Sequence, residues 1–291
     1  MIAYQTFSEY CRTKFGGKVY KLALKGGETC PNRDGTKGFG GCTFCANGSG
    51  DFAEDEGSVA EQVARAKFRL RNKTNAERFI AYFQSYTATY GNLSESRRRF
   101  SEAAETDGIV AVSVATRPDC LGEEALSVLR EVRAKKPLFV ELGLQTIHDR
   151  VAEAFHRGYR TEEYFRAVDK LHEIGANVVT HVILGLPQES RSETLQTVQA
   201  VAGVTDGIKL QLLHVLSGTP LAELYERGEY RPLSREEYLS LVVDCLRLLP
   251  YDVAVHRMTG DAPKRLLLAP LWSADKKGVL NALHAAIAQA E

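Results

Sequence analysis

Three cysteines with a spacing suited to metal binding lie close together near the start of the chain. Cys30, Cys42 and Cys45 give the pattern C-x11-C-x2-C, in a glycine-rich stretch that lets the backbone wrap closely around a ligand. Three thiolates suit a soft metal centre. A structural zinc site is normally closed by four ligands, and Cys11 would have to supply the fourth. An iron–sulfur cluster on three cysteines would instead leave one iron open to an exogenous ligand.

The composition indicates a reducing compartment for these thiols. The 291-residue chain is 44% hydrophobic and 25% charged, as in ordinary globular proteins, and no apolar run approaches the roughly 18–20 residues that span a bilayer. The first residues carry no apolar export segment, so we expect a cytoplasmic protein with no membrane partner. Cys11, Cys120 and Cys245 are isolated, and each fits a small buried hydrophobic residue.

Short apolar runs alternate with helical stretches along the whole chain. Strands are predicted at Val19–Leu24, Phe79–Phe83, Ile109–Ala115, Leu138–Leu144, Asn177–Leu184, Ile208–Val215 and Asp252–His256. Helices are predicted after the capping boxes that begin at Ser58 and Ser234, and over Glu123–Lys135, Glu162–Ile174 and Glu193–Val201. This alternation implies a parallel α/β sheet, either open and doubly wound or a partial barrel, with ligands at the carboxyl ends of the strands.

Polar residues near those strand ends are candidates for ligand contacts. Arg117 follows the third strand and could bind a carboxylate, although with Asp119 it could equally form a local ion pair in a turn. Glu141 and Gln145 lie an even number of residues apart on the fourth strand and therefore share one face. His181 on the fifth strand could bind a ligand or be a satisfied interior histidine.

The cysteine loop, with Phe44 directly before its last cysteine, resembles the cluster loop of radical S-adenosylmethionine (SAM) enzymes. Its first gap is longer than the family's common C-x3-C-x2-C and is similar to that of the elongator catalytic subunit. The whole chain resembles the YhcC/YtqA-type group of this family. The segments that carry this resemblance are Gly17–Tyr20, Thr29–Thr36, Tyr82–Tyr86, Thr116–Asp119, Glu141–Gln145, His181–Pro187 and His256–Asp261.

The resemblance implies a fold and a division of the chain. The fold is a partial (β/α)6-type barrel of the α/β class, formed by a radical SAM core at residues 18–258. Short extensions precede and follow it, at residues 1–17 and 259–291.

The resemblance also implies a [4Fe-4S] cluster held by Cys30, Cys42 and Cys45, with SAM on its open iron. One electron from the cluster would break the carbon–sulfur bond of SAM and give methionine and a 5′-deoxyadenosyl radical. The residues expected to contact SAM are Phe44, Gln84, Ser85, Tyr86, Thr87, Ser113, Arg117, Glu141, Gln145, Arg157 and His181. The family's usual Gly-Gly-Glu is absent from the segment at residues 84–87.

The elongator-type relatives suggest tRNA as the substrate, modified at the wobble uridine. Candidate RNA contacts are Arg65, Arg69 and Lys73, spaced four apart on one predicted helix face, and the run Arg97, Arg98 and Arg99. A solvated helix surface explains these charges equally well, since the formal net charge of the chain is zero. A one-electron reductase such as a flavodoxin or ferredoxin is the second expected partner. A zinc-stabilised, non-catalytic RNA-binding protein is the alternative.

Overall fold

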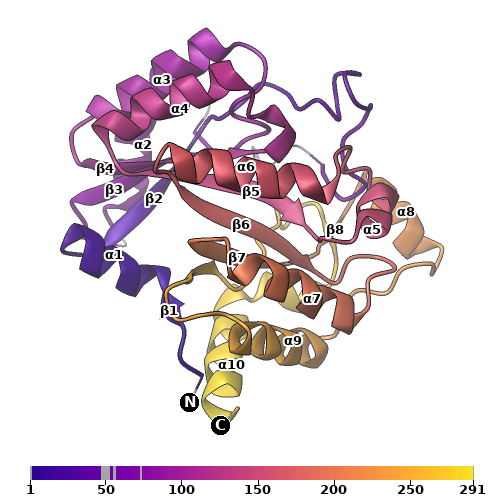
Figure 1. Cartoon of the computed structure of the whole chain (residues 1–291). Helices are drawn as coiled ribbons and strands as arrows, with labels where there is room; N and C mark the ends of the chain where they lie inside the picture. The colour runs from indigo at the N-terminus through magenta and orange to yellow at the C-terminus, as the bar shows by residue number, and fades with distance from the viewer. Residues whose placement is uncertain (1, 47–52, 55–56, 73, 291) are drawn as a thin grey trace.

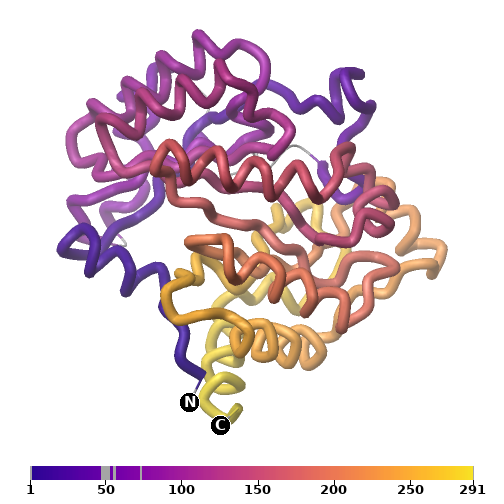
Figure 2. Tube along the Cα trace, viewed as in Figure 1, coloured from indigo at the N-terminus to yellow at the C-terminus, as the bar shows by residue number. Residues whose placement is uncertain are grey.

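The computed structural model describes residues 2–46, 53–54, 57–72 and 74–290. At its centre is an eight-stranded sheet of order β1-β9-β7-β6-β5-β4-β3-β2, in which each pair of neighbours is parallel. Its strands are β1 (Gln5–Thr6), β2 (Val19–Leu24), β3 (Arg78–Phe83), β4 (Ile109–Thr116), β5 (Leu138–Gln145), β6 (Asn177–Leu184), β7 (Gly207–Leu212) and β9 (Ala254–Arg257). From β2 to β7 the chain adds strands in sequence order, which the colour gradient in Figure 2 follows across the sheet.

Helices connect successive strands, as the alternating pattern of the sequence predicts (Figure 1). They are α1 (Phe7–Phe15), α2 (Val59–Leu70), α3 (Leu93–Glu105), α4 (Glu123–Lys135), α5 (Asp149–Ala154), α6 (Thr161–Glu173), α7 (Arg191–Ala202), α8 (Pro220–Glu226), α9 (Arg235–Arg247) and α10 (Lys276–Gln289), with short 3-10 helices at Pro118–Cys120 and Leu271–Ala274. Both predicted capping boxes are confirmed: Ser58 and Ser234 each accept a hydrogen bond from the amide three residues later. Among the described residues, every helix is too short or too polar to cross a lipid bilayer.

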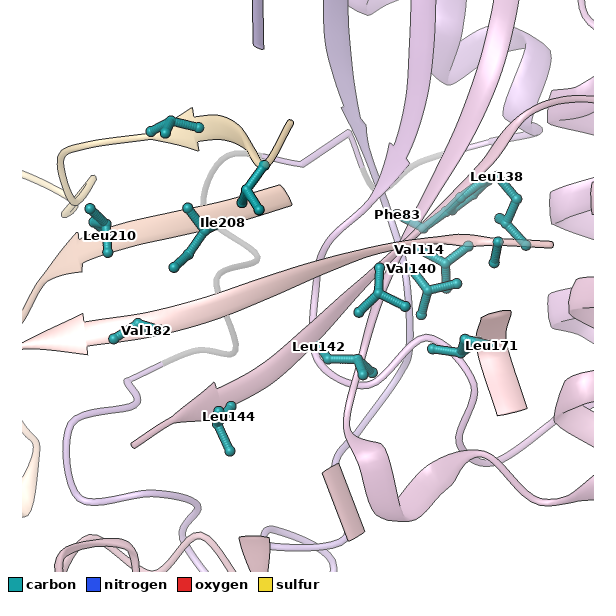
Figure 3. Packing of buried hydrophobic residues seen from close by; sticks show 14 of the residues in the cluster. Phe83, Val114, Leu138, Val140, Leu142, Leu144, Leu171, Val182, Ile208 and Leu210 are labelled. Carbon is teal, nitrogen blue, oxygen red and sulfur yellow. The ribbon is translucent and has the colours of Figure 1, made fainter. Parts of the chain in front are cut away.

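Alternate residues of each strand face either the helices or the interior of the curved sheet. On β5, Leu138, Val140, Leu142 and Leu144 are fully buried on the helix side, where they belong to the same apolar cluster as Leu171 of α6. Figure 3 shows these side chains with those of the neighbouring strands. Phe139, Glu141, Gly143 and Gln145 alternate with them and lie on the other face. This inner face is apolar at Phe139 and lines the polar cavity from Glu141 onward.

Two contacts across the interior show how strongly the sheet curls. Lys21 on the edge strand β2 donates to Glu141 on β5, with Nζ 2.6 Å from Oε1. The same ammonium lies 3.2 Å from Nδ1 of His256 on β9, near the opposite edge of the sheet. A flat sheet would hold these strands far apart, because neighbouring strands are spaced by about 4.8 Å. The sheet is therefore a partial barrel with a lumen, which confirms the expected fold.

The first helix closes the lumen at the amino ends of the strands. Phe7 of α1 stacks against His256 with ring centroids 3.8 Å apart. Cys11 of the same helix is buried against Ile80 and Phe139, in an apolar cluster that fills this end. The opposite end, where the carboxyl ends of the strands lie, carries the cysteine loop.

One predicted strand is wrong as a single element. The apolar run Ile208–Val215 divides into β7, which ends at Leu212, and a separate two-residue strand β8 (Val215–Leu216). The second piece leaves the main sheet and pairs with β10 (Leu267–Ala269) in an antiparallel ribbon. The residues are buried both before and after the break between β7 and β8, so hydrophobicity does not reveal where the hydrogen bonding to the main sheet ends.

Candidate active site

The cysteine loop is held against the end of β3 by backbone contacts that require glycine. The Gly26 amide donates to Ser85 Oγ and the Gly27 amide to the Ser85 carbonyl, both at 2.8 Å. A Cβ on Gly27 would lie 2.4 Å from the carbonyl oxygen of Thr87, a separation that side chains do not tolerate. The close approach places the segment at residues 84–87, which the sequence marked for SAM, directly beside the start of the cysteine loop.

Cys30, Cys42 and Cys45 all line one cavity of about 690 Å³. Two polar side chains of the same loop donate to their sulfurs: Asn32 Nδ2 lies 3.6 Å from Cys42 Sγ, and Arg33 Nη2 lies 3.6 Å from Cys45 Sγ. Burial raises the pKa of the Cys42 thiol to about 11, so a bound cation is needed to favour its thiolate at neutral pH.

The described residues contain no group of three His, Cys, Asp or Glu side chains that converges on the position of a single metal ion. The structure therefore gives no support to a mononuclear zinc site completed by Cys11, which lies at the opposite end of the lumen. A cluster makes a different demand, because each cysteine binds a different iron and the sulfurs stay apart. Three thiols around one cavity, two of them with N–H donors on sulfur, fit a [4Fe-4S] group.

Nine of the eleven residues expected to contact SAM line this same cavity: Phe44, Gln84, Tyr86, Thr87, Arg117, Glu141, Gln145, Arg157 and His181. Tyr86, three residues after β3, and Gln145, the last residue of β5, have left-handed backbone, with φ of 51° and 68°. Such strain in residues other than glycine is common at ligand sites. Ser85 and Ser113 do not line the cavity but bind groups next to it: Ser85 accepts a hydrogen bond from the Gly26 amide, and Ser113 donates one to Glu141.

The two arginines of this set are engaged within the chain. Arg117 forms a bidentate pair with Asp119, at 2.9 Å for both contacts, so the local ion pair considered from the sequence is present. Arg157 is fully buried, and its five N–H groups all find partners in the chain. Those partners are the carbonyls of Leu144, Thr146 and Tyr159, the Asp149 carboxylate and the Thr161 hydroxyl. Because no donor is left for the SAM carboxylate, the geometry favours a positioning role for Arg157.

Deeper in the lumen lies a cluster of polar side chains that we call the polar floor: Lys21, Tyr82, Glu141, His181, Lys209 and His256. Glu141 is its centre and contacts both lysines and His181, so it binds other side chains of the chain as well as lining the cavity. Burial lowers the pKa of His181 to about 4, which keeps its imidazole neutral.

Sequence reasoning missed Lys21, Tyr82, Lys209 and His256 in this cluster, and it also missed Asn32 and Arg33 in the loop. A signal for the lysines exists in the sequence, since each is the one charged residue in a mostly apolar strand, β2 or β7. A cation at such a position must find a buried partner.

The arginines proposed for RNA contacts are already paired with carboxylates of the chain. These pairs are Arg65–Glu54, Arg69–Glu54, Arg97–Glu131, Arg98–Glu95 and Arg99–Glu95. Lys73 lies outside the described residues. The pairs reduce the positive charge that α2 and α3 present to solvent, and RNA binding by this set stays a prediction.

Comparison with known proteins agrees with this geometry. The model of the radical SAM superfamily matches residues 27–201, and that of the radical SAM C-terminal domain matches residues 205–289. The chain belongs to the radical SAM superfamily. Membership implies an enzyme with a [4Fe-4S] cluster and SAM as cofactors.

Several relatives of this radical SAM chain are similar over most of its length. YtqA of Bacillus subtilis is 43% identical over 284 residues, which cover 97% of this chain and 88% of that protein. YhcC of Escherichia coli is 40% identical over 262 residues, covering 89% and 84%. A tRNA uridine(34) acetyltransferase of Methanocaldococcus jannaschii is 28% identical over 178 residues, covering 60% of this chain and 32% of that protein.

Among solved structures, archaeal Elp3 from Methanocaldococcus infernus has a similar fold. Its TM-score is 0.69 at 18% identity, and the match covers 92% of this chain and 63% of that chain. At this identity the likeness supports the fold alone.

Proposed function

We propose that this chain carries a [4Fe-4S] cluster on Cys30, Cys42 and Cys45 and uses it to cleave SAM reductively. The observation that carries the proposal is the position of the three thiols. They line a single cavity at the carboxyl ends of a parallel half-barrel, where ligands of such sheets bind. Family membership supports the same assignment.

When bound, the cluster supplies one electron to SAM, whose carbon–sulfur bond breaks to give methionine and a 5′-deoxyadenosyl radical. The chain's own residues bind, orient and shield the reactants. Phe44 packs on Phe155 with ring centroids 5.4 Å apart, which fixes the loop next to the last cysteine. Tyr86 and Gln145 present backbone and side-chain polar groups to the cavity from two strand ends. The apolar cluster that contains Cys11 and Phe139 fills the end of the lumen opposite the cysteine loop and excludes water there.

For the substrate we propose tRNA, modified at the wobble uridine. Support comes from the relative named as a tRNA uridine(34) acetyltransferase, which matches 60% of this chain. The match covers only 32% of that protein, so we propose the same substrate for this chain but not the same chemical modification. A flavodoxin or ferredoxin in the cytoplasm would supply the electron.

The test is anaerobic reconstitution with iron and sulfide, reduction, and chromatography of the products formed from SAM. We expect 5′-deoxyadenosine and methionine from the wild-type chain and from Cys245→Ser, and neither product from Cys42→Ser. Comparison of modified nucleosides in tRNA from cells with and without the gene tests the substrate. An unchanged nucleoside profile, together with no salt-dependent tRNA binding by the protein, would refute the tRNA assignment while leaving SAM cleavage intact.

A further inference from the structure

The centre of the polar floor is a single carboxylate that is fully engaged. Glu141 is 1% exposed, and both of its oxygens are hydrogen-bonded. Oε1 accepts from Lys21 Nζ at 2.6 Å and from Ser113 Oγ at 2.8 Å. Oε2 accepts from His181 Nε2 at 2.8 Å and from Lys209 Nζ. A buried carboxylate with this set of donors is ionised, since the lysines favour its charged form against burial.

The charges around Glu141 do not balance. Two ammonium groups, on Lys21 and Lys209, face this one carboxylate. His181 and His256 add no charge, because burial lowers the pKa of both imidazoles. Arg257, which also lies near the floor, pairs with Asp261 at 3.0 Å, and Lys276 contacts the same carboxylate, so this group brings no excess negative charge to the floor. The polar floor therefore holds an excess of one positive charge when both lysines are protonated, and burying such a charge is costly.

Lys209 is the more deeply buried of the two ammonium groups and has a donor to spare. It donates to the Tyr82 hydroxyl at 3.1 Å and to Glu141, and its third N–H has no partner among the described residues. Lys21 likewise has two hydrogen-bond partners, Glu141 and His256, and it lies over the rings of Phe7 and Tyr82, whereas Lys209 lies over the Tyr82 ring alone. Both lysines line the cavity that also reaches the cysteines. A ligand that enters past the SAM site can thus reach the unused donor.

We propose that the polar floor is an anion-binding site, in which Lys209, supported by Lys21, holds a carboxylate or phosphate group of the substrate at the closed end of the lumen. The inference rests on the proposed function and extends it, because it defines a chemical group that the substrate carries. An anion placed there accepts a hydrogen bond from the third N–H of Lys209 and balances the excess positive charge of the polar floor. It also anchors the substrate at the end of the lumen opposite the cysteines.

The site should bind anions more weakly at high pH. Burial lowers the pKa of Lys209 to about 7, with Glu141 opposing this shift and Lys21 and Arg257 adding to it. Only the ammonium form attracts an anion, so the apparent affinity should fall about tenfold per pH unit above pH 7. The titratable groups that face Lys209 are Tyr82 of β3, Glu141 of β5, His181 of β6, Lys21 of β2, and His256 and Arg257 of β9. Of these, Tyr82 has its pKa raised and His181 and His256 have theirs lowered, in each case away from neutrality, so the pH dependence of anion binding is assigned to Lys209.

The experiment uses the full chain, reconstituted anaerobically and saturated with SAM. Thermal unfolding is followed against increasing acetate in one arm and inorganic phosphate in the other, with ionic strength held constant by chloride at pH 6.5. A specific ligand raises the midpoint with saturation, because it binds only the folded state. Lys209→Met removes the ammonium, Lys209→Gln keeps a donor for Glu141 in case the first variant is unstable, and Lys170→Met on exposed α6 is the matched control.

We expect one of the two anions to stabilise the wild type and Lys170→Met, and its apparent affinity to fall at least tenfold in both Lys209 variants. The arm that saturates identifies the group as a carboxylate or a phosphate. The inference is overturned if neither anion acts beyond chloride or if the Lys209 variants bind like the wild type. It is also overturned if the effect appears only in a parallel titration without SAM, which would place the anion at the site of the SAM carboxylate. SAM cleavage is measured on the same samples, so a failure of the proposed function appears separately.

Discussion

Arg33 Nη2 lies 3.6 Å from the sulfur of Cys45 and 2.6 Å from the carbonyl oxygen of the same residue. One guanidinium group therefore fixes the backbone of this cysteine and donates to its thiol. Hydrogen bonds and positive charge near a cluster sulfur stabilise the reduced, more negative state of the cluster.

Arg33→Met should lower the reduction potential of the reconstituted cluster by tens of millivolts, given that a tenfold shift in a one-electron equilibrium is about 59 mV. The measurement is an anaerobic redox titration followed by electron paramagnetic resonance. Arg130→Met, on the exposed side of α4, is the control and should leave the potential unchanged. An unaltered potential in an Arg33 variant with full iron content would contradict the assignment.

Replacing Cys30, Cys42 or Cys45 singly by Ser should abolish iron and sulfide binding, because each of the three thiols that line the cavity would hold a different iron. The same change at Cys11, Cys120 or Cys245, all of them buried, should retain about four irons per chain. Metal and sulfide analysis after anaerobic purification measures both outcomes. Zinc in place of iron, or a requirement for Cys120, would show that the cluster is wrongly placed.

Arg157→Met should destabilise the fold by about 3 kcal/mol, because it removes the five hydrogen bonds of a buried guanidinium group. Three carbonyls lose a donor, whereas Asp149 keeps the two hydrogen bonds that Thr161 donates. Denaturant unfolding of the apoprotein measures this. Arg160 approaches the same carboxylate at 3.6 Å but is 71% exposed, so Arg160→Met should cost little. A stable Arg157 variant that binds SAM weakly would instead support the direct contact expected from the sequence.

Ionisation of Glu189 should lower the free energy of unfolding as the pH rises. Burial raises the pKa of this carboxyl to about 7 in the folded state, against 4.5 for its ordinary value. The unfolded chain therefore releases this proton first, and folding stability is lost progressively between about pH 4.5 and 7. In Glu189→Gln this loss is absent, so the difference in unfolding free energy between variant and wild type should move in favour of the variant over that range. Exposed Glu226→Gln is the control, and parallel curves for all three proteins would rule out the effect.

The order of strands and helices could be predicted because it is encoded locally. Apolar runs and capping residues such as Ser58 act within a few neighbours, and the cysteines were conspicuous by spacing. The polar floor could not be predicted, because Lys21 and Lys209 are 188 positions apart and meet only where the sheet curls. Nor does local sequence reveal that Arg69 is bound by Glu54, since Glu54 belongs to a different segment, bridged to Leu24 of β2.

The pairing of β1 with β9 has a consequence for biosynthesis. Gln5 and Thr6 lie beside Ala254 and Val255, so the paired residues leave the ribosome 249 positions apart. Until β9 emerges, α1 lacks the ring of His256 on which Phe7 stacks, and the amino-terminal end of the lumen lacks part of its wall. Contacts of such long sequence separation form slowly. The end of the lumen that α1 covers can therefore close only after β9 has been synthesised.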